Sequence, residues 1–251
     1  MPKSVLKYAA DGLLLKIIRS DFVPPLCIIL AVLTVVFAVG CISFRRKGRA
    51  FEGMMCKFMA SFGFISVAVV GYCLNPADTY YFCLVCFALM FGFFGDVLLG
   101  IKEVAPTFRG KLVPLGTLYF LIGHVFYLCA FITRSGFNLG ALIFGLCGGI
   151  FALAVIKLLK MKVDNKLWII MSVYYFALTY KAASAAVLAF GSGQAAYIIA
   201  FIGAVLFVIS DTCLAFLYFT PVKRKNIWVT VELSTYYPAQ ILLAMSVALM
   251  K

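Results

Sequence analysis

Long apolar runs separated by short polar or basic segments dominate this chain. A helix needs about 20 apolar residues to cross the hydrocarbon core of a bilayer, and the sequence offers eight runs of about that length. The first run begins at Pro24-Pro25, and proline is well suited to the first turn of a helix. We therefore expect eight membrane-spanning helices, at residues 22–43, 57–74, 79–100, 113–133, 139–159, 167–190, 194–219 and 228–249.

The segment before the first run has a different pattern. Between residues 1 and 21, apolar side chains recur at helical spacing on one face, and Lys7, Asp11 and Arg19 lie on the other. An amphipathic helix of this kind rests in the membrane interface and does not cross the bilayer. The domain prediction is thus an interfacial helix at 1–21, followed by a single transmembrane domain at 22–251.

Composition supports the same fold class. Hydrophobic residues make up 65% of the chain and charged residues 12%, whereas a soluble domain has roughly 45–50% and about 25%. The chain shows no segment polar enough to form a soluble domain. We predict an all-α, polytopic membrane protein.

The net charge of +13 raises the question of nucleic-acid binding, but the placement of the basic residues argues against it. They cluster between apolar runs, as in Arg45-Arg46-Lys47 and Lys223-Arg224-Lys225. Segments on one side, counted at 45–57, 102–111, 157–166 and 223–225, hold 15 Lys and Arg, and those on the other side hold 6. The positive-inside rule then predicts a cytoplasmic basic side and two lumenal or external termini.

A few ionisable residues lie within the predicted spans, where an ionisable group is costly and usually functional. Asp96 and Asp211 fall in the second halves of two spans that run in the same direction, towards the basic side, and Glu232 enters the last span from that side. His124 and Lys181 lie deeper. We expect the three carboxyls to share one cavity that opens to the basic side.

The chemistry of such a site can be narrowed but not fixed. A single histidine excludes a three-histidine zinc centre, and the absence of G-x-S-x-G disfavours a serine hydrolase. Two neighbouring carboxyls in a medium of low dielectric can remain one protonated and one ionised, which suits acid-catalysed cleavage through an oxocarbenium-like transition state. The same pair suits proton-coupled transport, and each Asp could instead be a structural partner, for example of Lys181.

Four motifs carry a resemblance to a known family. They are Gly95-Asp96 followed by Leu98 and Leu99, His124-x-Phe126-Tyr127, Ser210-Asp211 within a segment that starts at Gly203, and Tyr236-Tyr237-x-Ala239-Gln240. Their order and content resemble the YhhN-like lysoplasmalogenase family over most of the chain. The resemblance implies hydrolysis of the vinyl ether bond of lysoplasmalogens, which releases a fatty aldehyde and glycerophosphocholine or glycerophosphoethanolamine.

The resemblance also suggests roles for particular residues. Asp96 and Asp211 would be the acid and the charge-stabilising carboxylate, and no metal or organic cofactor would be needed. Basic residues at the cavity mouth, such as Lys102 or Lys223, would meet the lipid phosphate. Lys181 belongs to no motif of the family and is included for its place inside a span. The candidate substrate-binding residues are His124, Lys181, Glu232, Tyr237 and Gln240.

The expected partners are a lysophospholipid substrate and membrane lipid, without nucleic acid, and a homodimer is left open. The expected location is the endoplasmic reticulum membrane, with the active site in the cytoplasmic half. The competing interpretation is a proton-coupled transporter or a lipid-binding membrane protein that uses the same carboxyls.

Overall fold

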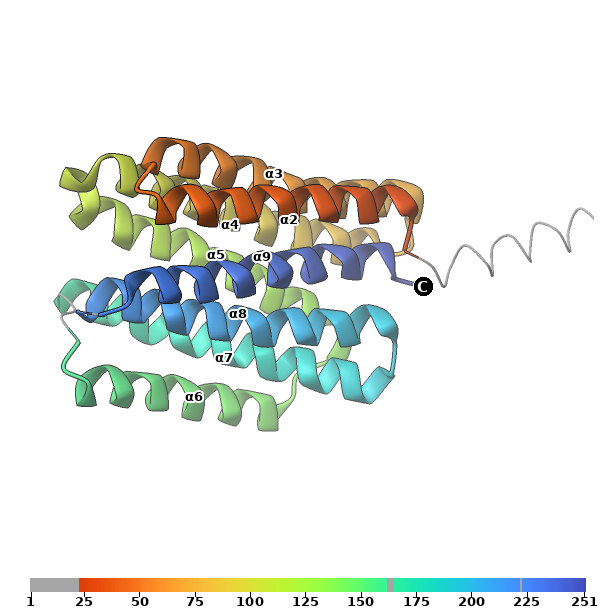
Figure 1. Ribbon diagram of the computed structural model, residues 1–251. Coiled ribbons are helices and arrows are strands. Elements are labelled where there is room, and N and C mark those ends of the chain that lie inside the picture. Colours follow the sequence, from red (N-terminus) through yellow and green to blue (C-terminus); the bar gives the residue numbers. More distant parts are fainter. Residues whose placement is uncertain (1–22, 162–164, 222) are drawn as a thin grey trace, which may run out of the picture.

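The structure is a computed structural model that describes residues 23–161, 165–221 and 223–251 (Figure 1). These residues form long helices joined by short connections. The predicted interfacial helix at 1–21 lies outside the described residues. The helices are α2 (Pro25–Arg46), α3 (Ala50–Leu74), α4 (Thr79–Val104), the short 3₁₀ helix η1 (Pro106–Phe108), α5 (Arg109–Ser135), α6 (Leu139–Leu158), α7 (Asn165–Ser192), α8 (Ala195–Phe219) and α9 (Lys225–Ala248).

The helix boundaries agree with those predicted to within a few residues, except at the start of α3. This helix begins at Ala50, about two turns before the predicted residue 57. The preceding turn is short because Gly48 adopts a positive φ of 74°, which glycine tolerates without strain. Lys57 was therefore counted wrongly among the loop charges of the basic side. It lies inside α3 and is 5% exposed.

Seven helices of the described part of the chain, α2 to α8, are long and apolar enough to cross a membrane. The all-helical polytopic fold is thus confirmed. α9 is as long as the others but less apolar, because it carries polar side chains that face the interior of the bundle. Glu232, Tyr236, Tyr237 and Gln240 are all buried on this helix. Helices packed against these side chains keep them away from lipid, so α9 can still lie among the spans.

The helices lie side by side, and neighbours in sequence run antiparallel (Figure 1). α9 is central: it packs against α8 on one side and against α2, α3 and α4 on the other. Glycine allows the closest approach, because a Cβ at Gly203 would lie only 2.9 Å from the carbonyl oxygen of Ala239. This contact brings α8, which carries Asp211, directly against α9, which carries Gln240.

One end of the bundle collects the basic clusters, and we call it the basic end. The C-terminal ends of α2, α4, α6 and α8 and the N-terminal ends of α3, α5, α7 and α9 meet there. Arg45 and Arg46 close α2, Lys102 lies in the last turn of α4, and Lys157 lies in the last turn of α6. Cations at these positions favourably face the negative ends of the helix dipoles.

Candidate functional site

Asp211 lies at the centre of a buried hydrogen-bond network made by three helices. The Tyr174 hydroxyl, from α7, donates a hydrogen bond of 2.6 Å to Asp211 Oδ2. His124 Nε2, from α5, lies 3.2 Å from the same oxygen and 3.0 Å from the Tyr174 hydroxyl. On the far side of the imidazole ring, Lys181 Nζ lies 3.2 Å from His124 Nδ1.

The order of these contacts assigns donors and acceptors along the network once Lys181 is taken as an ammonium group. Lysine nitrogen donates when it is an ammonium group, so His124 Nδ1 accepts, and Nε2 then carries the hydrogen that points at Asp211. Lys181, His124 and Asp211 thus form a hydrogen-bonded chain that crosses from α7 through α5 to α8. Of the two expected binding residues, His124 contacts the Asp211 carboxyl directly and Lys181 reaches it through the imidazole ring.

Lys181 is held in an aromatic setting. It is 0% exposed, and its Nζ lies 4.1 Å from the ring centroid of Phe207 and 5.4 Å from that of Tyr127. Cation–π attraction of this kind is stronger where water is excluded. It helps to hold a lysine inside the bundle, where no carboxylate is within ion-pair distance of it in the described chain.

Asp96 belongs to a second network. Lys57 Nζ lies 3.0 Å from Asp96 Oδ1 as an ion pair, and that oxygen has no aligned hydrogen bond. Asp96 Oδ2 accepts hydrogen bonds from the Ser61 hydroxyl at 2.6 Å and the Tyr236 hydroxyl at 2.7 Å. Asp96 is 1% exposed, so its charge is neutralised by Lys57 and not by water.

The remaining predicted residues belong to this second network or to its edge. Gln240 Nε2 donates to the Tyr236 hydroxyl at 3.1 Å, and Gln240 Oε1 accepts from the Tyr127 hydroxyl at 2.8 Å. The Tyr237 hydroxyl donates to the Lys57 carbonyl oxygen at 3.4 Å. Glu232 lies closer to the basic end, with Oε2 4.0 Å from Arg45.

Aromatic rings separate the two networks. The Phe207 ring packs edge-on against His124, with the ring centroids 4.7 Å apart, and against Tyr236, with the centroids 5.4 Å apart. The Phe120 ring also packs edge-on against Tyr236, at 6.0 Å. The single cavity expected for the three carboxyls is therefore replaced by two networks that touch through rings. Of the three carboxyls, Asp211 lines a cavity described below, whereas Asp96 and Glu232 do not.

The Asp211 cavity is small, about 30 Å³, and lies between two larger ones. Its walls include Tyr174, Phe120 and Asp211. Through Tyr218 it adjoins a cavity of about 140 Å³ at the basic end. Through Tyr175 and Ala215 it adjoins a groove of about 390 Å³. The Asp211 carboxyl thus lies between the basic cavity and the apolar groove.

The apolar groove is bounded by α6, α7 and α8. Its lining is almost wholly hydrocarbon and includes Phe144, Phe151 and Val205. Gly148 of α6 keeps the helices close, because a Cβ there would come within 2.8 Å of Thr179. A groove of this composition favours a hydrocarbon chain over a polar ligand.

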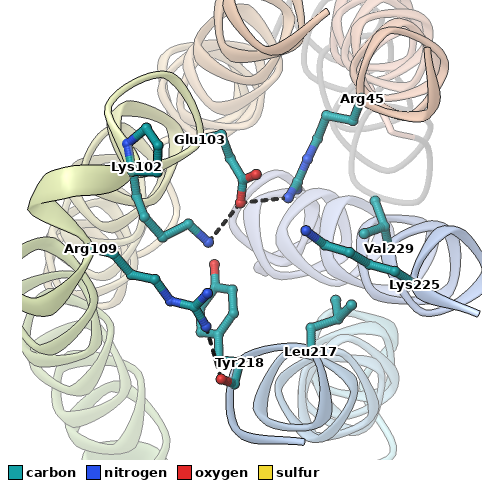
Figure 2. A pocket seen from close by; sticks show the side chains of 9 residues that line it. Arg45, Lys102, Glu103, Arg109, Leu217, Tyr218, Lys225 and Val229 are labelled. Carbon is teal, nitrogen blue, oxygen red and sulfur yellow. Dashed lines mark hydrogen bonds and ion pairs between the residues drawn. The ribbon is translucent and has the colours of Figure 1, made fainter. Parts of the chain in front are cut away.

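The basic cavity is shown in Figure 2. Arg45, Lys102, Arg109 and Lys225 line it, each from a different helix. Glu103 Oε1 pairs with Lys102 at 2.6 Å and with Arg45 at 3.0 Å. Lys102, which the sequence placed at the mouth of the site, is part of this lining; Lys223 is not.

Sequence reasoning missed Lys57, Ser61 and Tyr174 as partners of the two carboxylates. Lys57 follows a run of basic residues, so the sequence counts it with a loop, whereas its helix already begins at Ala50. Ser61 and Tyr174 are ordinary residues of apolar helices, and no spacing rule marks them. Lys57 and Ser61 are four residues apart and so lie on one face of a helix. This spacing is the sequence signal that points to a polar face on α3.

The donor set offers little to a metal ion. In residues 23–161, 165–221 and 223–251, no group of three His, Cys, Asp or Glu side chains is placed to hold one. Tyrosine, lysine and serine surround the two aspartates instead, and these groups donate hydrogen bonds to carboxylates.

Comparison with known proteins identifies the family but gives no individual relative. No curated protein and no solved structure matches this chain. The model of the YhhN family matches residues 54–247, which covers α3 almost from its start to the end of α9 and includes both aspartate networks. The matched region is well over half of the chain, and so this protein belongs to the YhhN family.

Proposed function

We propose that this protein is a lysoplasmalogenase, a membrane enzyme that hydrolyses the vinyl ether bond of 1-alkenyl lysophospholipids. The observation that carries the proposal is the placement of Asp211. Its buried carboxyl is held by Tyr174 and His124, and it lines a cavity between the basic cavity and the apolar groove. A lysoplasmalogen has the same order of parts, with its vinyl ether between a phosphate head and a hydrocarbon chain.

In the proposed reaction, protonated Asp211 is the general acid. It donates its proton to the outer carbon of the vinyl ether, the one not bound to oxygen, and the inner carbon becomes an oxocarbenium ion. The ionised Asp211 then faces the cation and stabilises it. Proton donation by a positioned side chain typically contributes about 10²- to 10⁴-fold to a rate.

Water completes the reaction. The Asp211 carboxylate accepts a proton from water as its oxygen adds to the inner carbon, which yields a hemiacetal and restores the acid. The hemiacetal then collapses to a fatty aldehyde and the free glycerol hydroxyl, so the products contain all atoms of substrate and water. Tyr174 and His124 hold the carboxyl in place through both steps, and Lys181 fixes the imidazole through Nδ1.

Asp96 has a different role in this proposal from the one expected from sequence. Its carboxylate is neutralised by Lys57 and does not line the Asp211 cavity. It acts through Tyr236, whose ring packs against Phe120 and Phe207 beside Asp211. Asp96 is thus proposed as a positioning residue, and the catalytic proton is assigned to Asp211.

The hydrocarbon chain of the substrate is proposed to occupy the apolar groove between α6 and α8. This groove joins the Asp211 cavity at Tyr175 and Ala215. Entry from the side of the bundle suits a lipid that arrives from the bilayer, because the chain need not leave apolar surroundings.

A proton-coupled transporter is the second candidate, and the Lys181–His124–Asp211 chain is the observation that favours it. The two functions differ in a simple assay. Purified protein in detergent, where no gradient exists, is incubated with 1-alkenyl-glycerophosphocholine and with its saturated 1-alkyl analogue. A lysoplasmalogenase releases aldehyde from the first and nothing from the second, whereas a transporter leaves both intact.

A further inference from the structure

We infer that the basic cavity is a phosphate-binding site that recognises the phosphodiester of a single-chain lipid and is indifferent to the amine of its head group. The inference rests on the proposed function for the identity of the lipid, but the cavity carries its own evidence. That evidence is an excess of positive charge: two of its four lining cations, Arg109 and Lys225, lie in no ion pair with a carboxylate of the described residues.

The charge excess is plain in the lining. Arg45, Lys102, Arg109 and Lys225 bring four positive charges from α2, α4, α5 and α9, and Glu103 is the one carboxylate among the lining residues. Figure 2 shows these side chains directed into one space. Glu103 is shared between Lys102 and Arg45. Glu232 also lies 4.0 Å from Arg45, so the positive charge in excess is that of Arg109 and Lys225.

The N-terminal ends of two helices add to this excess of positive charge. Arg109 is the first residue of α5, and Lys225 is the first residue of α9. The N-terminus of a helix carries a partial positive charge, so a cation there is disfavoured unless an anion is near. Arg109 donates a hydrogen bond of 2.9 Å to the Tyr218 carbonyl oxygen near the end of α8, which offsets part of its cost (Figure 2). Neither Arg109 nor Lys225 has a carboxylate partner in the described residues, and a phosphate group in the cavity of about 140 Å³ would stabilise both.

The groups that could recognise a quaternary ammonium are already engaged. The Tyr218 ring is covered by Lys102, whose Nζ lies 3.8 Å from the ring centroid, and Arg109 lies 5.8 Å from the same centroid. Glu103 is paired twice. A choline or ethanolamine cation would therefore meet net positive charge here and would remain outside, in water.

The position of the basic cavity beside the Asp211 cavity explains how a bound phosphate would orient the substrate. Tyr218 lines both the basic cavity and the Asp211 cavity. A phosphate held at the basic end would therefore leave the bond between glycerol and chain near Asp211. The same chemistry could attract free phosphate, so the test has to separate the two sources.

The test uses binding and not catalysis. Binding of four probes to full-length protein in detergent is measured: non-hydrolysable 1-alkyl-glycerophosphocholine, 1-alkyl-glycerophosphoethanolamine, 1-alkylglycerol and inorganic phosphate. The two phospholipid probes should bind with affinities within threefold of each other and about tenfold or more above alkylglycerol, as expected for a charge-assisted contact to phosphate. Inorganic phosphate should compete with both.

The double variant R109Q/K225Q, which leaves the Glu103 pairs intact, should weaken binding of the phospholipid probes by at least about tenfold and leave alkylglycerol binding unchanged. Lys111→Gln, an exposed lysine of α5 outside the cavity, is the matched control and should change neither. Equal binding of alkylglycerol and the phospholipids would overturn the inference, as would a tenfold preference for choline over ethanolamine. Because the probes are not cleaved, either result leaves the hydrolase proposal to its own assay.

Discussion

The Tyr174 hydroxyl donates a hydrogen bond of 2.6 Å to Asp211 Oδ2, and both side chains lie within the membrane-spanning part of the bundle. The contact joins α7 to α8 at a carboxyl that also accepts from His124. It therefore fixes the direction in which Asp211 faces its cavity.

Replacement of Tyr174 by phenylalanine should lower the rate of aldehyde release by about tenfold or more, because a hydrogen bond to a charged group is worth roughly 1.5–3 kcal/mol. The ring and its packing stay in place. Tyr180→Phe is the control, because this tyrosine lies on the same helix and is equally buried. Its ring stacks on that of Phe176, with the two centroids 5.6 Å apart, at a place away from Asp211. Steady-state kinetics of both variants check the prediction, and equal rates in both would contradict a role for the Tyr174 hydroxyl.

The Lys57–Asp96 pair allows stability to be separated from chemistry. Asp96→Asn alone should lower the free energy of unfolding by about 3–5 kcal/mol, because it leaves the Lys57 ammonium buried without a partner. The double variant K57M/D96N removes that charge as well, and its melting temperature in detergent should return towards the wild-type value.

Activity of the same double variant then decides the role of Asp96. If Asp96 only positions Tyr236, K57M/D96N should recover a large part of the hydrolysis rate together with its stability. A variant that is as stable as the wild type but inactive would show that the Asp96 carboxylate itself takes part in the reaction.

The apolar groove should set the chain length that is accepted. Val205 is 38% exposed in the groove lining, so Val205→Trp would fill part of the space. We expect a raised KM for long-chain substrates and little change for short-chain ones. Ile202→Trp, on the same helix but outside the lining, serves as the control. Identical chain-length profiles for the two variants would place the chain elsewhere.

The sequence predicted the helices well because span length and hydropathy are local properties. It does not give the start of α3, because Lys57 inside this helix closely follows the basic residues of the preceding turn. Lys57 shows why: a buried lysine and a loop lysine look alike until the partner, here Asp96 of another helix, is known. α9 shows the complementary case, since its polar residues lower its hydropathy but face inward.

The sequence singles out the polar residues of the candidate site but not their pairing. Asp96, His124, Asp211 and Gln240 stand out as polar residues in apolar spans, and all are buried. Which of them touch depends on how helices far apart in sequence pack. Phe207 divides the site into two, and an aromatic residue within an apolar span gives no sign of that role in sequence.

The measurement that tests the central claim most directly is single-turnover release of aldehyde from 1-alkenyl-glycerophosphocholine by wild-type protein and by Asp211→Asn. Asparagine keeps the shape of the side chain but has no proton to give to carbon, so its rate should fall by about 10³-fold while binding of the 1-alkyl analogue and the melting temperature stay close to wild type. Aldehyde release by folded Asp211→Asn at a rate near that of the wild type would contradict the account.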